Sequence, residues 1–234
     1  MTREDYLQTV LAAYAVVRVL SDRNGGQVLH LRHKEKGKDV VLRSMPKPVA
    51  AYERLCSLHC DDLPDVYDAV SCEDGQIVWE EFIDGLTVAE VLETGQRYRY
   101  RGAKAVLQGV CRALSALHGQ GIVHRDVKPE NVMIASDGRV VLIDMSISRE
   151  VKDAPADTAV MGTVGYAAPE QLGIAQSDAR TDVYAAAVLL NILLTGKHPS
   201  ELVARGRAGK IVRKGTQLNR DDRVQTAEKL LEML

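Results

Sequence analysis

The stretch His124-Arg-Asp-Val-Lys-Pro-Glu-Asn131 decides the fold expected for this chain of 234 residues. It sets an acid, a base and an amide at short, fixed spacing, at Asp126, Lys128 and Asn131. A helical pattern precedes it, and a short apolar segment follows and ends in Asp144, thirteen residues after Asn131. A plain helix-to-strand turn with a solvated charge run would not require these eight positions.

The octapeptide resembles the catalytic loop of protein kinases, in the version found in bacterial serine/threonine kinases. The resemblance implies that Asp126 accepts or orients the proton of the substrate hydroxyl and that Lys128 meets the transferred phosphate. It implies that Asn131 and Asp144 hold Mg²⁺, a hard cation that prefers oxygen ligands and bridges the phosphates of ATP. The family's Asp-Phe-Gly is here Asp-Met-Ser, where the methionine can fill the hydrophobic role.

The sequence further downstream resembles the end of a kinase activation segment. Gly162-Thr-Val-Gly-Tyr-Ala-Ala-Pro-Glu170 matches a substrate-docking loop that precedes Ala-Pro-Glu. The resemblance implies a buried ion pair between Glu170 and Arg223. Asp182 resembles the aspartate that starts the central helix of the C-terminal lobe and braces the catalytic loop.

The segment from Asp144 to Glu170 is expected to be the mobile, regulated part of the chain. Arg125 is suited to pair with a phosphate on this segment. Thr158 is the candidate acceptor, because Thr163 lies in the docking loop. The alternative is that Thr158 is a polar loop residue only.

The match weakens at the expected phosphate-binding loop. Kinases have Gly-x-Gly-x-x-Gly-x-Val there, and its backbone amides cradle phosphates. Aligned on Val28, this chain has Ser21-Asp-Arg-Asn-Gly-Gly-Gln-Val28, with only the third glycine, Gly26, in place. Gly26 and Val28 are therefore candidate cofactor-binding residues, and a plain hairpin turn is the alternative.

Arg43 stands where the family has a lysine on the α- and β-phosphates of ATP. Arginine keeps the charge but has a planar, bulkier fork, so the change is not conservative. Its carboxylate partner stays open. Glu53 is the only acid in the following helix, but the family's spacing points nearer to Ala51, and a solvated helix face is the alternative. Glu80 guards the back of the expected pocket and could pair with Arg43.

The connector between the lobes, Glu81-Phe82-Ile83, is expected to bind adenine, because the edge of adenine matches peptide N–H and C=O groups. Glu81 and Ile83 are the candidate contacts.

Hydrophobic periodicity changes along the chain. Five segments are predicted as strands, at 14–20, 27–31, 39–43, 66–70 and 76–82. Helices are predicted at 49–58, around 106–117, at 182–194 and after Arg223 to the end. Strands first and helices afterwards indicate an α+β chain. The resemblance implies one two-lobed kinase domain, 1–234. Its N-terminal lobe, 1–83, would hold a five-stranded antiparallel sheet plus one helix, and its C-terminal lobe, 84–234, would be mostly helical.

Composition and charge limit the kinds of partner that can be expected. Net charge of −2 and 26% charged residues give no reason to expect nucleic acid or an anionic membrane. No stretch approaches the roughly 20 apolar residues of a membrane span, and residues 1–10 lack signal-peptide features. A soluble, cytoplasmic protein is expected. Cys56, His59 and Cys60 suggest a metal site but lack a second ligand pair, so free thiols are the favoured interpretation.

The resemblance implies transfer of the γ-phosphate of ATP to serine or threonine hydroxyls of a protein substrate, with Mg²⁺ required. Arg43 and the altered glycine loop count against full efficiency, so the second hypothesis is a pseudokinase, a regulatory module that binds nucleotide or protein. A small-molecule kinase is disfavoured, because those enzymes lack the docking segment before Glu170.

Overall fold

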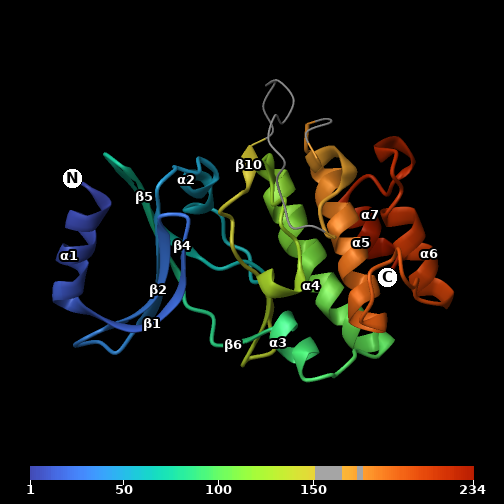
Figure 1. Cartoon of the computed structure of the whole chain (residues 1–234), viewed down its shortest axis with the longest axis horizontal. Coiled ribbons are helices and arrows are strands. Elements are labelled where there is room, and N and C mark those ends of the chain that lie inside the picture. Colours follow the sequence, from blue (N-terminus) through green and yellow to red (C-terminus); the bar gives the residue numbers. More distant parts are fainter. Residues whose placement is uncertain (151–164, 173–175) are drawn as a thin grey trace. The chain divides into compact units, whose positions relative to one another are not determined.

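The computed structural model describes residues 1–150, 165–172 and 176–234 and contains two compact units (Figure 1). The N-terminal unit comprises Met1–Cys60 and Pro64–Ile83, and the C-terminal unit comprises Asp61–Leu63 and Asp84–Leu234. One unit is built on a five-stranded antiparallel sheet and the other is mostly helical, which confirms the α+β fold class.

The sheet of the N-terminal unit has the strand order β1-β2-β3-β5-β4, and every pair is antiparallel. Its strands are β1 (Tyr14–Arg23), β2 (Gly26–His33), β3 (Asp39–Met45), β4 (Val66–Cys72) and β5 (Gly75–Glu81). The first four extend beyond the predicted segments, whereas β5 begins and ends one residue earlier than the predicted 76–82. The ladder between β1 and β2 continues to the pair Arg23 and Gly26. Helix α2 (Ala51–Leu55) is shorter than the predicted 49–58.

The two faces of this sheet differ. Helix α1 (Arg3–Ala13) lies on one face and packs Val10 onto a buried cluster of Leu29, Leu31, Val40, Leu42 and Ile77. Cross-strand partners point to the same face of a sheet. The register therefore gathers a second set on the opposite face, namely Val28, His30, Val41, Arg43, Val78 and Glu80. This face carries Val28 and Arg43, two of the residues predicted to meet ATP.

Helix α1 was not predicted from the sequence. Its start is nevertheless marked by a capping box, in which the Thr2 side chain accepts from the N–H of Asp5 and the Asp5 carboxylate accepts from the N–H of Thr2. The N-terminal unit thus has two helices rather than one.

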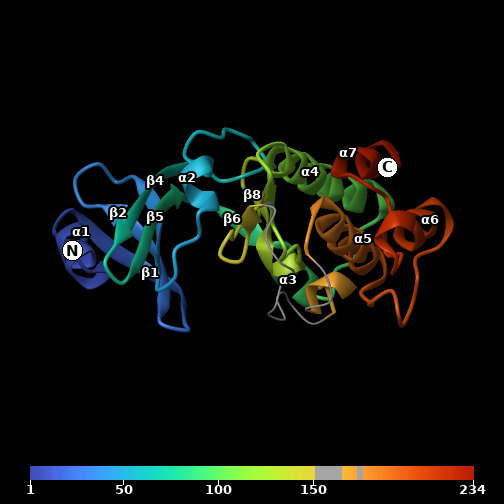
Figure 2. The same ribbon diagram turned by 90° about the horizontal axis from the view of Figure 1, so that it is seen from above.

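The C-terminal unit is built around two long helices that lie side by side (Figures 1 and 2). Its helices are α3 (Val88–Glu93), α4 (Tyr100–Gly119), α5 (Ala179–Thr195), α6 (Gly206–Gly215) and α7 (Ala227–Glu232). Among its described residues, three short 3₁₀ turns accompany them, η1 (Pro129–Asn131), η2 (Pro169–Leu172) and η3 (Arg220–Asp222). Its small sheets pair β6 (Gly85–Thr87) with β8 (Val132–Ala135) and β9 (Val140–Leu142), and β7 (Ile122–Val123) with β10 (Arg149–Glu150).

Helix α5 begins at Ala179, earlier than the predicted Asp182. Asp178 is its N-cap: the Asp178 carboxylate accepts from the N–H of Arg180, and the Thr181 side chain completes a capping box. Asp182 therefore lies in the first turn of the helix and is not its first residue, because the capping box starts the helix three residues earlier. The predicted last helix also begins later, at Ala227 after the N-cap Thr226.

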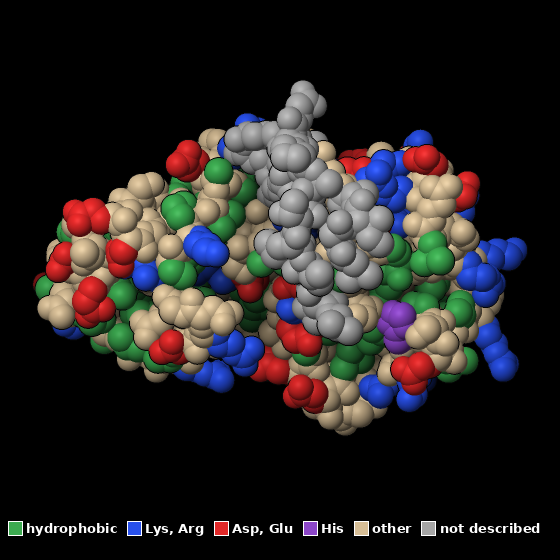
Figure 3. Space-filling view, turned by 45° about the horizontal axis from the view of Figure 1, so that its top comes forward, with side chains coloured by type: hydrophobic (Ala, Val, Ile, Leu, Met, Phe, Trp, Pro, Cys, Tyr) green, Lys and Arg blue, Asp and Glu red, His purple; other side chains and the backbone are tan. Residues whose placement is uncertain are grey.

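Helix α6 was not predicted, and it is strongly amphipathic. It buries Ala208, Ile211 and Val212, and its exposed face is basic, with Arg207, Lys210, Arg213 and Lys214. Lys and Arg side chains gather at this end of the C-terminal unit (Figure 3). Within the described ranges, no helix is both long enough and apolar enough to cross a membrane.

Candidate active site

The catalytic-loop residues connect β7 to η1 and are held in place by Asp182. Its Oδ2 accepts from the N–H of His124 at 2.8 Å, and its Oδ1 accepts from the N–H of Arg125 at 2.8 Å. His118 Nε2 lies 2.8 Å from the same carboxylate. Complete burial alone would raise the pKa of Asp182, but these hydrogen bonds and the imidazole of His118 hold it below its usual value. The predicted bracing role of Asp182 is confirmed.

Arg125 adopts a left-handed backbone conformation with φ of 73°. Such a conformation is uncommon for a residue with a side chain and persists only where the surroundings impose it. Here Asp182 holds the N–H of Arg125, and Gln171 Nε2 donates to its carbonyl at 2.8 Å. Gln171 follows the Ala-Pro-Glu sequence, and its contact with the loop was not predicted. The end of the activation segment therefore supports the catalytic loop directly.

His124 is completely buried and uses both ring nitrogens. Its Nδ1 accepts from the N–H of Asp126 at 3.2 Å, so Nε2 carries the proton and donates to the carbonyl of Ile143 at 3.2 Å. Burial lowers the pKa of His124, which favours this neutral form. The ring thereby connects Asp126 to Ile143, the residue between β9 and Asp144.

Three predicted catalytic residues meet at the carboxylate of Asp126. Lys128 Nζ donates to Asp126 Oδ2 at 2.6 Å, and Asn131 Nδ2 donates to the same oxygen at 2.9 Å. Asn131 Nδ2 also lies 2.8 Å from the carbonyl of Asp126. The fold thus brings together Asp126, Lys128 and Asn131 in one hydrogen-bonded group.

Asn131 and Asp144 are the candidate metal ligands. Because Asn131 commits its amide nitrogen to Asp126, its Oδ1 is the end of the amide suited to a cation. The N–H of Ile143 donates to the carbonyl of Asn131 at 2.8 Å, which places Asp144 one residue beyond this contact. Asp144 has a left-handed backbone with φ of 70°, and its Oδ1 accepts from the N–H of Ser146.

One carboxylate and one amide oxygen fit Mg²⁺, which keeps several waters and is shared with substrate phosphates. Nowhere in the described ranges do three His, Cys, Asp or Glu side chains cluster as an all-protein metal site. The donor set therefore fits a cation held jointly with a phosphate ligand.

Arg43 is paired within the sheet of the N-terminal unit. Its Nε donates to Glu80 Oε2 at 2.5 Å, and the two residues are 7% and 3% exposed. Arg43 lies opposite Val78 and Glu80 lies opposite Val41, so the two are diagonal neighbours on one face. Glu53 is exposed on α2. The suggested pairing of Glu80 with Arg43 is confirmed.

Gly26 and Val28 lie at the start of β2, directly after the β1–β2 turn. Val28 lies opposite Arg43 and on the same face. A Cβ atom at Gly26 would lie 2.9 Å from the carbonyl oxygen of Ser44, so close packing of β3 requires glycine here. This requirement explains the glycine without a nucleotide, and a phosphate contact at Gly26 stays a prediction.

The connector residues continue from the end of β5. The N–H of Glu81 donates to the carbonyl of Asp65 at 2.8 Å, so an adenine contact at Glu81 would use its carbonyl. The ring of Phe82 stacks on His30 with centroids 3.8 Å apart and planes at 8°. Ile83 is buried. Adenine binding at Glu81 and Ile83 stays a prediction.

Glu170 and Arg223 form the predicted buried pair. Arg223 Nη1 donates to Glu170 Oε1 at 2.7 Å, and Nη2 lies 3.2 Å from Oε2. Thr181 Oγ1 donates to the same carboxylate at 3.0 Å. Burial alone would raise the pKa of Glu170, but the Arg223 guanidinium holds it below its usual value. Thr158, Thr163 and the start of the docking loop lie outside the described residues.

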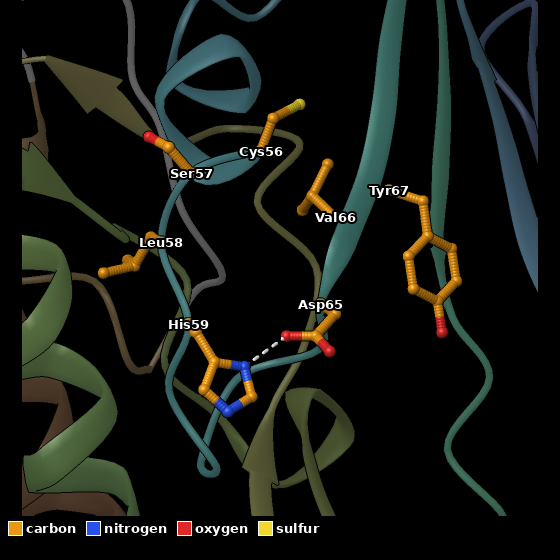
Figure 4. Close-up of a pocket in the computed structure, with 7 residues that line it drawn as sticks. All are labelled: Cys56, Ser57, Leu58, His59, Asp65, Val66 and Tyr67. Carbon is orange, nitrogen blue, oxygen red and sulfur yellow. Dashed lines mark hydrogen bonds and ion pairs between the residues drawn. The ribbon is translucent and has the colours of Figure 1, made fainter.

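A small open cavity of about 330 Å³ in the N-terminal unit bears on the suggested metal site (Figure 4). Its lining includes Cys56, His59 and Asp65, and His59 Nδ1 lies 2.8 Å from Asp65 Oδ1. The Cys56 sulfur points away from the imidazole (Figure 4). Burial raises the pKa of Cys56, which disfavours the thiolate that metals bind. Cys56 and Cys60 form no disulfide, in agreement with the thiols favoured from the sequence.

Comparison with known protein families matches residues 14–232 to the protein kinase domain. The chain therefore belongs to the protein kinase family, and the relatives named next are serine/threonine kinases of bacteria. "Probable serine/threonine-protein kinase SCO3848" of Streptomyces coelicolor is 39% identical over 205 residues, which are 80% of this chain and 30% of the relative. "Serine/threonine-protein kinase PknB" of Mycobacterium leprae is 38% identical over 122 residues, which are 51% of this chain and 20% of the relative. The chain spans less than a third of the length of these relatives.

Proposed function

We propose that this chain transfers the γ-phosphate of ATP to serine or threonine hydroxyls of a protein, with Mg²⁺ required. The observation that carries the proposal is the convergence of Lys128 and Asn131 on the carboxylate of Asp126. Membership of the protein kinase family and the named serine/threonine kinases among its relatives support the same activity.

In this mechanism Asp126 orients the substrate hydroxyl toward the γ-phosphorus. The bond between the hydroxyl oxygen and phosphorus forms as the bridging bond to the β-phosphate breaks, and the hydroxyl proton passes to the Asp126 carboxylate. Lys128 lies against Asp126 and offsets the negative charge of the transferred group. When bound through Asn131 and Asp144, Mg²⁺ would neutralise charge on the phosphates.

In the N-terminal unit, Arg43 would contact the α- and β-phosphates, with Gly26 and Val28 covering the nucleotide. The register supports this assignment, because Val28 and Arg43 share a face and lie opposite one another. The backbone of Glu81 and Ile83 would bind adenine.

One observation favours a second function. Arg43 replaces the family's lysine and is buried against Glu80, which is the arrangement expected if the fold serves as a pseudokinase that binds nucleotide or protein without turnover. The intact group around Asp126 favours catalysis over this alternative.

The test is a transfer assay with labelled ATP, a generic basic protein substrate and either Mg²⁺ or chelator. The proposal expects Mg²⁺-dependent phosphate on serine or threonine, located by mass spectrometry. Tight Mg²⁺-ATP binding without transfer would support the pseudokinase instead. Absence of both binding and transfer would contradict phosphate transfer and the nucleotide-binding form of the pseudokinase.

A further inference from the structure

Arg3, in the first turn of α1, joins three segments of the N-terminal unit. Its Nη1 donates to the carbonyl of Gly25 at 3.0 Å and to Ser44 Oγ at 3.1 Å. Its Nε lies 3.3 Å from Asp74 Oδ2, and its backbone N–H donates to Asp74 Oδ1 at 2.7 Å. The Arg3 side chain is only 16% exposed. One guanidinium therefore links the β1–β2 turn, strand β3 and the β4–β5 turn.

The β1–β2 turn is a tight two-residue hairpin. Asn24 and Gly25 both have left-handed backbones, with φ of 54° and 72°, and the flanking residues Arg23 and Gly26 are paired. An Asn-Gly pair in this conformation forms a two-residue hairpin without outside help. The exposed tip would ordinarily be among the more mobile parts of the sheet. The Arg3 contact is an additional restraint, placed at the tip itself.

The restraint also reaches the strand that carries Arg43. Ser44 is the next residue along β3 and points to the opposite face, the face that α1 covers. By holding Gly25 and Ser44 together, Arg3 fixes the distance between the turn and the segment that contains Arg43.

Helix α1 is a firm support for Arg3. Val10 is buried in the sheet's apolar cluster, and Trp79 Nε1 donates to the hydroxyl of Tyr6 at 3.0 Å. At the other end of the helix, Lys34 Nζ donates to the carbonyls of Leu11 and Ala12 at 2.7 and 3.0 Å. Packing along the helix and bonds at both ends hold its position on the sheet.

We propose that Arg3 is a positioning residue for nucleotide binding, which holds the β1–β2 turn at a fixed distance from Arg43. The inference rests on the proposed function, in which this turn covers the phosphates of ATP. A turn that is already ordered loses less conformational entropy when a ligand binds, and this saving appears as affinity. The restraint by Arg3 compensates for the absence of the family's first two loop glycines, at the positions where this chain has Ser21 and Arg23.

The experiment compares Arg3→Ala and Arg3→Lys with the parent chain. Arg32→Ala is the matched control, because it removes a bidentate arginine–aspartate pair from the same sheet, with Asp39, away from the turn. Calorimetry gives the Kd for Mg²⁺-ATP, and steady-state kinetics separate KM from kcat. Hydrogen exchange of residues 21–28 without nucleotide reports the restraint directly. Fluorescence of Trp79, the single tryptophan, reports whether α1 stays docked.

Arg3→Ala should raise the Kd and the KM for ATP about fivefold, because the β1–β2 turn loses the charge-assisted hydrogen bond that Arg3 donates to the carbonyl of Gly25. kcat should change less than about twofold, since no group at the transferred phosphate is altered. Exchange at 21–28 should accelerate, and Trp79 fluorescence should be unchanged. Arg3→Lys should lie between the parent and Arg3→Ala, and Arg32→Ala should match the parent.

Parent-like Kd in Arg3→Ala, whether or not exchange accelerates, would overturn the positioning role while leaving the proposed function intact. A parent chain that binds no nucleotide would overturn the proposed function and this inference together. If Arg3→Ala does not fold, Ser44→Ala decides, because it removes the acceptor on β3 and keeps α1. A Kd for Ser44→Ala equal to that of the parent would then overturn the inference.

Discussion

The Nε atom of Arg43 lies 2.5 Å from Oε2 of Glu80, and both side chains are buried on one face of the five-stranded sheet. Both residues belong to neighbouring strands of one ladder, so the pair is set by the sheet and does not depend on α2. Glu53, the only acid of α2, is exposed. The orientation of Arg43 is therefore built into the sheet.

Replacing Arg43 by lysine should lower kcat/KM for phosphate transfer. A lysine ammonium is a compact point charge and cannot reproduce the planar fork that meets Glu80. A misplacement of about 1 Å can cost roughly 100-fold in rate. Arg32→Lys, at an exposed pair, is the control and should leave kcat/KM unchanged. A clear rise in kcat/KM in Arg43→Lys would instead identify a decayed kinase site.

Removing the carboxylate at residue 80 should destabilise the fold. Glu80→Gln takes a counter-charge away from the buried Arg43 guanidinium, at a cost of roughly 3–5 kcal/mol in the free energy of unfolding. Glu53→Gln, the matched change on an exposed face, should cost less than about 0.5 kcal/mol. Urea denaturation measures both. Equal stabilities of the two variants would show that the Arg43–Glu80 pair contributes little.

The Glu170–Arg223 pair should hold η2 in place within the C-terminal unit. Arg223→Ala leaves the buried Glu170 without this ion pair and should lower the free energy of unfolding by roughly 3–5 kcal/mol. Arg213→Ala, on the exposed face of α6, should leave the free energy of unfolding nearly unchanged. A melting temperature for Arg223→Ala within error of the parent would contradict the prediction.

The same pair predicts a pH dependence of stability. Because the pKa of Glu170 is lowered in the folded chain, its contribution is complete above its ordinary pKa of 4.5. The contribution is lost as the pH falls through the lowered, folded-state value. The free energy of unfolding of the parent should therefore fall more steeply with acidification than that of Glu170→Gln. If the free energy of unfolding changed with pH equally in the two proteins, the Glu170–Arg223 pair would not be the source of the acid sensitivity.

Asp144→Asn should abolish transfer and leave the fold intact. The substitution removes the only carboxylate assigned to Mg²⁺, so the dependence of ATP affinity on Mg²⁺ should weaken as well. Asp137→Asn, at an exposed turn of the same unit, is the control. Calorimetric titration of ATP with and without Mg²⁺ gives the answer, and a full Mg²⁺ effect in Asp144→Asn would remove this residue as a ligand.

The sequence predicted those parts of the structure whose signals are local or specific. The octapeptide around Asp126 was sufficient to place Lys128 and Asn131 beside it, because the backbone of a short loop determines their distances. The strands followed from alternating apolar residues. The pair of Glu170 with Arg223, 53 residues apart, came from the family resemblance rather than from any local pattern.

Other features depend on tertiary packing. The sequence left both Glu53 and Glu80 open as partners of Arg43, and the choice between them follows from the strand order and register, which bring Glu80 beside Arg43. Gln171 reaches Arg125 only when η2 is folded against the loop. Helix α1 is a different case. Its capping box at Thr2 and Asp5 can be recognised in the sequence, but its apolar face is short, and its packing against the sheet becomes evident only in the structure.

The most direct test of the account is γ-phosphate transfer by Asp126→Asn compared with Asp137→Asn and the parent chain. The amide introduced by Asp126→Asn keeps the shape of the side chain but cannot accept the hydroxyl proton or attract Lys128. The account predicts Mg²⁺-dependent transfer by the parent and by Asp137→Asn, and loss of at least about 100-fold in kcat for Asp126→Asn, with ATP affinity retained. Undiminished transfer by Asp126→Asn would contradict it.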